Sequence, residues 1–308
     1  MDRLEAMSIL LAVVEAGSLS AAARRLGVPL PTVSRKVADL ESHLQTRLLH
    51  RTTRQLSLTE AGASYVHACR RILDDVAEAE RVATDEYAAP KGELALTAPV
   101  VFGRLHIVPL VAQFLADYPD IRIQLLLTDR VVHLMEEQID IALRIGALPD
   151  STLLARGVGA VRSVVCGSPA YFASRGVPAT PQQLSGHDCI SFDVLESRRA
   201  WVFGEGKQAV AVPVIARLGV NTAEAAIDAA ILGVGLVRVL SYQVADALAQ
   251  GKLAVVLQQF ESAPLPVSLV YKGPAPLTRK MQVFLDFAAM RLRESLARSS
   301  VRPQHLEM

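Results

Sequence analysis

Apolar residues in the first 45 positions of the chain recur at the spacing of a helix. Within residues 2–16 they stand three and four positions apart, which puts them on one helical face. The members of this face are Leu4, Met7, Leu11 and Val14. We expect them to lie in a core, and we expect Gly17 to end the helix.

Two further helices are predicted after short breaks. Ser18 is placed to cap a helix over Leu19–Leu26, and Gly27 supplies the left-handed residue that ends it. Pro31, at a first helical position, opens a third helix that runs to about Gln45. The apolar stripe of this third helix should point inward and consists of Val33, Val37, Leu40 and Leu44.

The opposite face of the third helix carries small and hydrogen-bonding side chains. At about 100° per residue, this face includes Pro31, Arg35, Ala38 and Ser42, with Thr32 and Ser34 beside it. A DNA recognition helix needs small residues at its start, because a bulky one would hold the backbone away from the base edges. Arg35 can reach guanine or phosphate, and the hydroxyls of Thr32 and Ser34 can make either kind of contact. The pattern therefore predicts a helix that enters the major groove.

A basic hairpin is predicted next. Residues 48–51 and 55–58 are expected to form strands around a turn at 52–54, which places Arg51 and Arg54 on a projecting hairpin, or wing. We expect their side chains to bind DNA phosphates. Between residues 16 and 58, seven basic and two acidic residues give a net charge of +5, whereas the whole chain carries only +1. This concentration of positive charge predicts double-stranded DNA as a partner. For any one arginine, the alternative is an ordinary solvated helix face.

Residues 59–87 are predicted to form one long helix that pairs with a second copy of the chain. Thr59 is placed as its N-cap. The apolar residues step by three and four, as in a heptad seam, and are Tyr65, Cys69, Ile72, Val76, Ala79 and Ala83. Charged residues fill the other faces, which suits a helix with solvent around it and a partner along one stripe. The alternative is a helix packed on the C-terminal domain of its own chain.

Strands and helices alternate after a breaker at residues 88–92. The expected strands are 93–97, Ile121–Leu127, 140–145, 163–166 and 267–271. The expected helices are 105–117, 131–137, 224–232, 242–250 and 279–297. Such alternation predicts an α/β sheet covered by helices on both faces, with ligands bound where loops leave the strand ends and helices begin.

Several such loops are candidates for a ligand site, with a purely structural cap as the alternative for each. They are residues 98–103, 128–130, 191–193 and a capping box at 221–224. Arg144 and Arg238 lie inside apolar runs, where a charge needs a partner. An internal salt bridge is the preferred interpretation for Arg144, and a cleft that receives an anion is preferred for Arg238.

Composition narrows the class of protein. A chain of 308 residues with 51% hydrophobic residues can build two or more cores. From the sequence we expect no apolar run as long as a membrane span and no leader before the first helix, and therefore a cytoplasmic protein without a membrane partner. The three cysteines lack metal-ligand spacing and are expected to be buried thiols, with a redox pair of Cys166 and Cys189 as the alternative.

Enzymatic function is not expected. The segment 233–238, Gly-Val-Gly-Leu-Val-Arg, lacks the third glycine of a dinucleotide-binding fingerprint, and it follows a predicted helix rather than opening one. A nucleophile elbow, a zinc-protease motif and a P-loop are all missing from the sequence. We therefore expect no catalytic residues, no bound metal and no cofactor.

Four segments resemble LysR-type transcriptional regulators, and the resemblance extends over essentially the entire chain. They are LLAVVEAGSLSAAARRLGV, VSRKVADLESHL, RLLHRTTRQLSLTEAG and NTAEAAIDAAILGVGLVRVLSYQVADALAQGKL. The resemblance implies an α/β fold class with an N-terminal winged helix-turn-helix, a dimerising linker helix and a C-terminal effector domain. That effector domain would have two α/β subdomains, like type 2 periplasmic binding proteins.

The resemblance also implies domain boundaries. The winged helix-turn-helix would span 1–58, the linker helix 59–88, a hinge 89–92 and the effector domain 93–300, with a disordered tail at 301–308. Within the effector domain, subdomain I would comprise about 93–163 and 267–300, and subdomain II about 164–266.

The function implied is sequence-specific regulation of transcription, in which a small-molecule effector bound in the interdomain cleft modulates promoter binding. RNA polymerase and a second or further copies of the chain, as a dimer or tetramer, are the other implied partners. The candidate DNA contacts are Ser18, Ser20, Pro31, Thr32, Ser34, Arg35, Lys36, Arg51 and Arg54. The candidate effector contacts are Pro99, Val100, Val101, Phe102, Thr128, Arg144, Ile145, Ser191, Asn221, Thr222 and Arg238.

The sequence departs from the family pattern at two places, one in each domain. Leu30 stands where relatives often have a polar residue that contacts a base, and Val100 and Val101 stand where many have a hydroxyl that holds an effector carboxylate. Only backbone N–H groups remain at the second place, which favours an aromatic or otherwise partly apolar effector. The remaining alternative is an architectural DNA-binding protein that responds to no effector.

Overall fold

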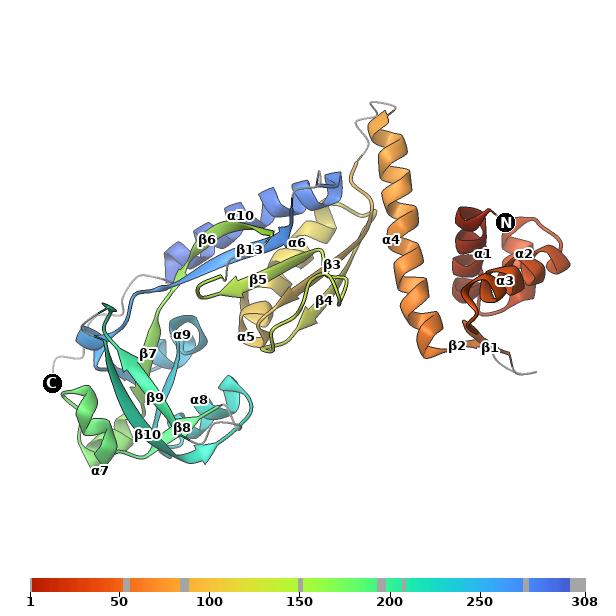
Figure 1. Ribbon diagram of the computed structural model, residues 1–308. Coiled ribbons are helices and arrows are strands. Elements are labelled where there is room, and N and C mark those ends of the chain that lie inside the picture. Colours follow the sequence, from red (N-terminus) through yellow and green to blue (C-terminus); the bar gives the residue numbers. More distant parts are fainter. Residues whose placement is uncertain are drawn as a thin grey trace. The chain divides into compact units, whose positions relative to one another are not determined.

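The protein consists of two compact units. The N-terminal unit comprises Met1–Glu93, Asp120–Arg122 and Thr278–Lys280, and the C-terminal unit comprises Leu94–Pro119, Ile123–Leu277 and Met281–Met308. Figure 1 shows the computed structural model, which describes residues 2–51, 56–83, 89–148, 152–192, 198–206, 209–273 and 277–299.

Three helices open the N-terminal unit, as the sequence predicts. Helix α1 spans Arg3–Ala16, α2 spans Leu19–Leu26 and α3 spans Leu30–Leu44. The Asp2 carboxylate accepts the N–H groups of Leu4 and Glu5 at the start of α1, and Ser18 Oγ accepts the Ala21 N–H at 3.1 Å at the start of α2. Gly17 and Gly27 end these two helices in the left-handed conformation.

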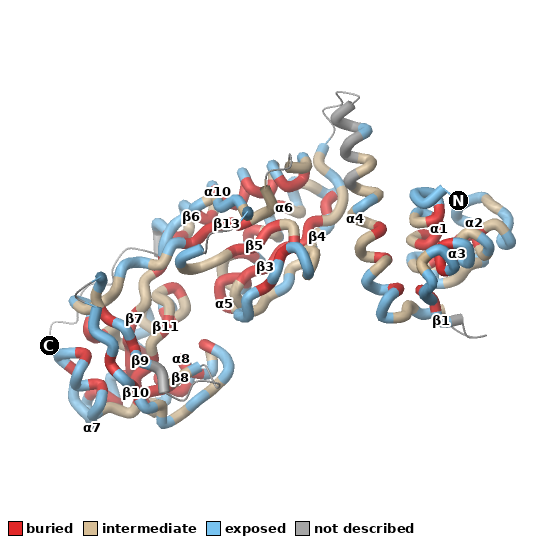
Figure 2. Tube along the Cα trace, viewed as in Figure 1, coloured by how far each residue is buried: buried red, intermediate tan, exposed pale blue. Residues whose placement is uncertain are grey.

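The buried face of α1 differs from the predicted one. Leu4 is 40% exposed, and the residues of α1 that are fully or almost fully buried are Ala6, Ile9, Leu10, Ala12 and Val13. Helix α1 is apolar on several sides, so its spacing fits more than one stripe. Contacts with α2, α3 and α4 select the stripe that is buried, and Figure 2 shows buried positions along α1. Leu11 and Val14 are only partly buried against the same core.

A buried carboxylate connects α3 to the hairpin. Glu41 is 7% exposed, and its Oε1 atom accepts the backbone N–H groups of Leu48 at 2.8 Å and Leu49 at 3.1 Å. The hairpin consists of β1, Leu49–Arg51, and β2, Leu56–Leu58, paired antiparallel. The predicted turn with Arg54 lies outside the described residues.

Helix α4, Glu60–Ala83, begins at the predicted cap. Thr59 Oγ1 accepts the Gly62 N–H at 2.9 Å. A Cβ at Gly62 would lie 2.0 Å from the carbonyl oxygen of Leu48, so only glycine permits this approach. Tyr65 and Val66 pack on the core of α1 to α3. The first residue of the predicted dimer seam, Tyr65, therefore contacts its own chain.

A five-stranded mixed sheet forms subdomain I. Its order is β4 (Ile121–Leu127), β3 (Gly92–Ala98), β5 (Ile141–Ile145), β13 (Leu265–Lys272) and β6 (Leu153–Val161). Strands β3 and β5 are parallel, and β13 is antiparallel to both of its neighbours. The helices associated with this sheet are α5 (Val100–Phe102), the π-helical turn η1 (Gly103–Ile107), α6 (Val108–Asp117) and α10 (Arg279–Ser299).

A six-stranded sheet forms subdomain II. Its order is β12 (Ala254–Val256), β7 (Ser163–Gly167), β11 (Leu236–Leu240), β8 (Cys189–Ser191), β10 (Val210–Gly219) and β9 (Arg198–Phe203). The accompanying helices are α7 (Pro169–Arg175), η2 (Pro181–Gly186), α8 (Ala223–Ile231), η4 (Ser241–Gln243), α9 (Ala245–Ala249) and η5 (Gln258–Phe260). The chain enters this sheet between β6 and β7 and leaves it between η5 and β13.

Three predicted helical segments differ in the structure. Residues 131–137 form turns instead of a helix, with Gln138 in a left-handed conformation directly afterwards. The segment 242–250 is divided between η4 and α9. The cap of α8 is Thr222 rather than Asn221, since Thr222 Oγ1 accepts the Ala225 N–H at 3.3 Å.

One apolar segment is longer than the sequence expectation allowed. Val100–Asp117 has the length and composition of a membrane-crossing helix. In the structure it is divided among α5, η1 and α6, and its largest side chains are buried in the C-terminal unit, among them Phe102 and Phe114. The Phe114 ring contacts Phe284 and Phe287 of α10, at centroid distances of 5.0 and 5.1 Å.

Cys166 and Cys189 cannot form a disulfide in this fold. They belong to β7 and β8, which are separated by β11, so their Cα atoms are about 9–10 Å apart, against the ~4.4–6.8 Å of a disulfide. Their side chains also belong to different hydrophobic clusters. Burial raises the pKa of each thiol to about 12, so the reactive thiolate is scarce at neutral pH.

We therefore predict that hydrogen peroxide leaves the native protein without a bond between Cys166 and Cys189. Peptide mass spectrometry of the treated protein should find both thiols unlinked, and iodoacetamide should label them rapidly only in urea. A peptide pair linked through these two cysteines after native treatment would contradict the buried positions.

The Glu41 contacts generate a second prediction. Glu41→Ala leaves two buried N–H groups without an acceptor and should destabilise the N-terminal unit by about 2–3 kcal/mol, whereas Glu41→Gln keeps an acceptor and should cost about 1 kcal/mol. Urea unfolding of the full chain measures the difference. The control is Ser42→Ala at the exposed neighbouring position, expected within about 0.5 kcal/mol of the parent. Equal stability of Glu41→Ala and Ser42→Ala would refute the role of this carboxylate.

Candidate nucleic-acid interface and ligand cavity

The predicted reading face of α3 lies on the surface. Pro31, Arg35, Ala38 and Ser42 are exposed, and Val33, Val37 and Leu40 are buried on the other side. Thr32 and Ser34 are half-buried at the margin of the exposed face. Leu30, the first residue of the helix, is 43% exposed and adds an apolar contact surface next to Pro31.

The start of α2 contributes hydroxyl groups to the candidate interface. Ser18 Oγ is held by its cap hydrogen bond, and Ser20 is exposed in the first turn. Only residues 27–29 separate α2 from α3, and the Val28 N–H donates to the Ala23 carbonyl at 3.1 Å. This is the short turn of a helix-turn-helix.

Helix α1 neutralises part of the basic charge. Arg25 pairs with Glu15 at 2.9 Å and donates to the Ala12 carbonyl, and Lys36 pairs with Glu5. Both acids lie outside the segment whose charge is +5, so the count overstates the charge available to DNA. Arg24, Arg35 and Arg47 are exposed. Arg51 is the last residue of β1, and the structure describes its backbone only. Arg54 lies outside the described residues.

A cavity of about 390 Å³ is lined by residues of both subdomains. Subdomain I contributes Pro99, Asp129, Ile145 and Leu265. The residues from subdomain II and its entry strand are Ser163, Cys189, Ile190, Ser191, Phe192, Ala200, Trp201, Val214, Ala216, Ala223, Arg238, Val239, Leu240, Tyr242 and Gln243. The size is that of a small-molecule site.

Four of the predicted effector residues line this cavity, namely Pro99, Ile145, Ser191 and Arg238. Thr128 and Arg144 line a second cavity, of about 930 Å³, whose wall lies within subdomain I and also includes Pro99 and Ile145. The remaining predicted residues line neither of these cavities: Val100, Val101, Phe102, Asn221 and Thr222. Val101 and Phe102 point into the core, where they are 2% and 0% exposed.

The backbone N–H expected to meet an effector is already occupied. The Val100 N–H donates to Asp129 Oδ1 at 3.1 Å. Asp129 belongs to the loop after β4 that was predicted from the sequence, but the interaction joins residues 29 positions apart. A local pattern cannot reveal such a contact.

The two arginines of the apolar runs differ from each other in their surroundings. Arg144 donates to the carbonyl oxygen of Val132, and among the described residues this backbone acceptor takes the place of the expected salt bridge. Arg238 lies in the cavity wall, as predicted, where its Nε donates to Ser163 Oγ at 3.0 Å and its guanidinium lies 5.4 Å from the centre of the Phe203 ring. Burial lowers the pKa of both guanidinium groups.

Sequence patterns missed most of the apolar wall. Trp201 and Val214 belong to β9 and β10, which pair antiparallel and were not predicted as strands. Trp201 is the only tryptophan of the chain, and a lone large aromatic residue outside any predicted element was the available signal.

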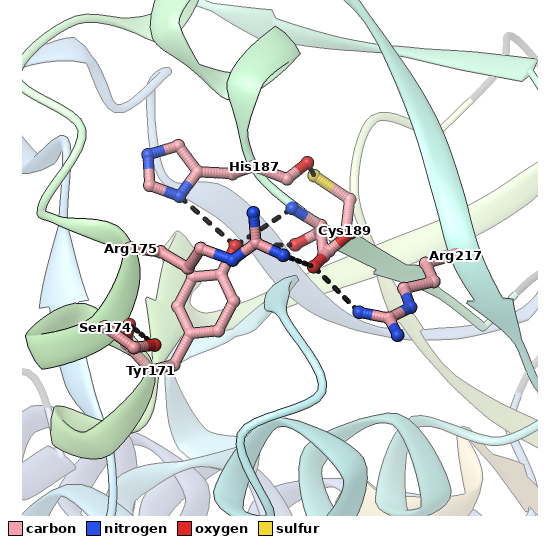
Figure 3. Close-up of polar contacts among 7 residues, drawn as sticks. Tyr171, Ser174, Arg175, His187, Cys189 and Arg217 are labelled. Carbon is pink, nitrogen blue, oxygen red and sulfur yellow. Dashed lines mark hydrogen bonds and ion pairs between the residues drawn. The ribbon is translucent and has the colours of Figure 1, made fainter.

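A polar network surrounds the residues directly before β8 (Figure 3). The Asp188 N–H donates to the Tyr171 hydroxyl oxygen at 2.9 Å, and this hydroxyl lies 3.2 Å from His187 Nδ1. The Asp188 carboxylate pairs with Arg175 at 3.3 Å and Arg217 at 3.0 Å. These contacts fix the start of the strand that carries Cys189 and Ser191 into the cavity wall. Burial and the nearby Arg175 lower the pKa of His187.

The two segments that cross between the subdomains are joined to each other. Arg162, between β6 and β7, pairs with Glu261, after η5, at 2.9 Å. The Ser241 N–H also donates to the Arg162 carbonyl at 2.8 Å, which places η4 at the crossing. From η4, Tyr242 reaches Phe102 and His106 of subdomain I with ring centroids 5.2 and 5.7 Å apart. Tyr242 thus contacts subdomain I and lines the cavity at once.

The described residues contain no group of three His, Cys, Asp or Glu side chains that could hold a metal ion. The polar groups of the cavity are hydrogen-bond donors and acceptors on an apolar wall. This arrangement suits binding of an organic ligand.

Comparison with known proteins gives the same two-part organisation. Residues 4–63 match the model of the bacterial regulatory helix-turn-helix protein, lysR family, and residues 88–293 match the LysR substrate binding domain. An HTH-type transcriptional regulator of Xanthomonas campestris pv. campestris is 36% identical over 288 residues, which cover 92% of this chain and 84% of the relative.

A second relative is known both as a sequence and as a structure. The HTH-type transcriptional regulator CrgA of Neisseria meningitidis serogroup B is 34% identical over 293 residues, covering 95% of this chain and 98% of CrgA. The solved structure of CrgA, a LysR-type transcriptional regulator, aligns with a TM-score of 0.60 and 35% identity, over 94% of this chain and 98% of that one. The chain therefore belongs to the LysR family of transcriptional regulators, as a DNA-binding protein with a substrate-binding domain and not as an enzyme.

Proposed function

We propose that the protein regulates transcription by binding promoter DNA sequence-specifically through α3 and the hairpin, and that a small molecule in the 390 Å³ cavity modulates this binding. The observation that carries the proposal is that one cavity is walled by both subdomains. A ligand there touches two parts of the domain at once, so it binds one arrangement of the subdomains more tightly than another.

The candidate contacts follow from the exposed groups. The side chains proposed to meet DNA are those of Ser20, Pro31, Thr32, Ser34 and Arg35, with Arg51 and Arg54 in the hairpin and Ser18 at the cap. Lys36 takes a secondary part, because its ammonium group is paired with Glu5. Pro99, Ile145, Ser191 and Arg238 are proposed to meet the effector.

Two copies of the chain are proposed to pair along α4. Ile72 is 37% exposed on the part of the seam that the N-terminal core leaves uncovered. A dimer, or a tetramer made of two dimers, would place recognition helices on half-sites about one helical turn or a multiple of it apart. Contact with RNA polymerase belongs to the same proposal.

An architectural DNA-binding protein without an effector is the second candidate. The cavity argues against this candidate, because DNA binding without an effector does not explain a ligand-sized cavity with an arginine in its wall. The two candidates differ in whether any small molecule changes the promoter footprint.

Arg35→Ala tests the reading face. We expect it to lower affinity for an operator, selected from a random duplex pool, by about 1–3 kcal/mol, and to lower affinity for a scrambled duplex much less, because a base contact is lost. Fluorescence anisotropy at fixed salt measures both. The matched control is Arg24→Ala, at an exposed position of α2, which should weaken both duplexes alike. An equal loss on both duplexes for Arg35→Ala would assign it to phosphate contact.

Ala216→Trp tests the cavity. The new indole should fill the space and remove the rise in Tm that a bound small molecule causes in the full chain, as measured with a library of aromatic acids, amides and amines. The control is Ile215→Trp, because Ile215 is the preceding residue of β10, is 80% exposed and is not part of the cavity lining. If Ala216→Trp still responds to the same compounds as Ile215→Trp, the effector does not bind in this cavity.

A further inference from the structure

The charged groups of the 390 Å³ cavity are placed on different elements and have opposite signs. Asp129 is an exposed residue of the loop after β4, in subdomain I, and Arg238 is a half-buried residue of β11, in subdomain II. Their surroundings decide which end of a ligand each can bind. That a ligand enters this cavity is taken from the proposed function.

Asp129 makes its part of the cavity unfavourable to an anion. Its Oδ1 atom accepts the Val100 N–H at 3.1 Å, so this backbone donor is already satisfied by a carboxylate of the protein. A ligand carboxylate placed beside it would be repelled, because like charges at close range raise the free energy of the complex. A carboxylate oxygen accepts hydrogen bonds, and it therefore favours a hydroxyl or amino group of the ligand.

Arg238 makes its part of the cavity favourable to an anion. Its described partners are the Ser163 hydroxyl, through Nε at 3.0 Å, and the Phe203 ring at 5.4 Å. Neither partner is negatively charged, and the contact to Ser163 uses only Nε, so it leaves the two terminal nitrogens for another acceptor. A planar guanidinium held in this way matches the two oxygens of a carboxylate. Burial, which lowers the pKa of Arg238, would be offset by such a counter-ion.

Most of the other lining residues are apolar and some are aromatic, beside the polar side chains of Ser163, Ser191 and Gln243. Trp201 is 8% exposed, and Ile145, Ile190 and Val214 lie around the same space. Flat rings pack well against such side chains and lose little conformational entropy on binding. The wall therefore suits the body of a small aromatic compound.

We propose that the cavity binds a small aromatic carboxylic acid, with its carboxylate on Arg238 and a hydroxyl or amino substituent toward Asp129. The orientation is the reverse of one in which a ligand carboxylate sits on the Val100 N–H. Asp129 occupies that place and acts as the acceptor that selects the substituted acid.

The test uses matched ligands and the full chain. The probes are amino- and hydroxy-substituted benzoates and indole carboxylates, the corresponding unsubstituted acids, and the amide of each acid. We expect at least one substituted acid to raise Tm and to bind in calorimetry, and its amide to bind at least tenfold more weakly. If the amides or amines bind as well as the acids, the assignment of the carboxylate to Arg238 is wrong. Absence of binding by every acid also overturns the proposal.

Variants separate the two ends of the ligand. Arg238→Gln should weaken the acid at least tenfold and leave the weak binding of the amide unchanged, whereas Arg238→Lys, which keeps the charge and controls for folding, should bind the acid with intermediate affinity. Lys252→Gln is the control, because Lys252 is an exposed cation of the same subdomain outside the cavity lining. Asp129→Asn should improve binding of the unsubstituted acid and reduce the preference for the substituted one. Unchanged acid affinity in Arg238→Gln would overturn the proposal.

The outcomes also distinguish this proposal from the proposed function. If a neutral or cationic compound raises Tm in the parent and not in Ala216→Trp, the cavity is an effector site and only the ligand class is wrong. If no compound of the library raises Tm in the parent and loses this effect in Ala216→Trp, both the ligand class and the proposed effector site are wrong.

Discussion

The ion pair between Arg162 and Glu261 joins the only two places at which the described strands pass from one sheet of the C-terminal unit to the other. Both side chains are largely withdrawn from solvent, at 24% and 12% exposure, so the pair is less screened than a surface pair. The backbone of Arg162 also holds Ser241, and the next residue, Tyr242, lines the cavity. The position of the cavity wall therefore depends on this crossing.

A domain built in this way can respond to a ligand without losing its fold. Each sheet has its own hydrophobic clusters, and the sheets are linked by two segments. A ligand shifts the balance between subdomain arrangements only by its difference in affinity for them. In the proposed function, groups contributed by different subdomains, such as Asp129 and Arg238, would produce that difference because their separation depends on the arrangement.

The N-terminal unit shows how tertiary contacts adjust a charged surface. Glu5 and Glu15 of α1 pair with Lys36 and Arg25, so two of the basic side chains serve the packing of the three helices. Arg35 remains exposed on α3, beside residues small enough to allow a close approach to DNA. The positive charge left unpaired at this surface is consequently smaller than the sequence charge implies, while the Arg35 side chain stays exposed.

The sequence by itself determined the features that depend on neighbours within about four residues. The caps at Ser18, Thr59 and Gly27 and the inward stripe of α3 were predictable because hydrogen bonds and side-chain periodicity of a helix are local. The order of helix-turn-helix, hairpin and long helix followed from the same signals, and the family resemblance gave the division of the C-terminal domain.

Tertiary structure alone decided which of several equivalent local solutions is used. The stripe of α1 that is buried, the partner of Arg144 and the pairing of Val100 with Asp129 each depend on residues 12 or more positions away or on packing against other helices. The segment 131–137 has a helical pattern and forms turns, and Trp201 reaches the cavity through a strand pair that no local pattern marked. The physical reason is that the position of a residue in the sequence determines the face of the helix or strand on which its side chain lies. The residue that this side chain contacts depends on which helices and strands pack together.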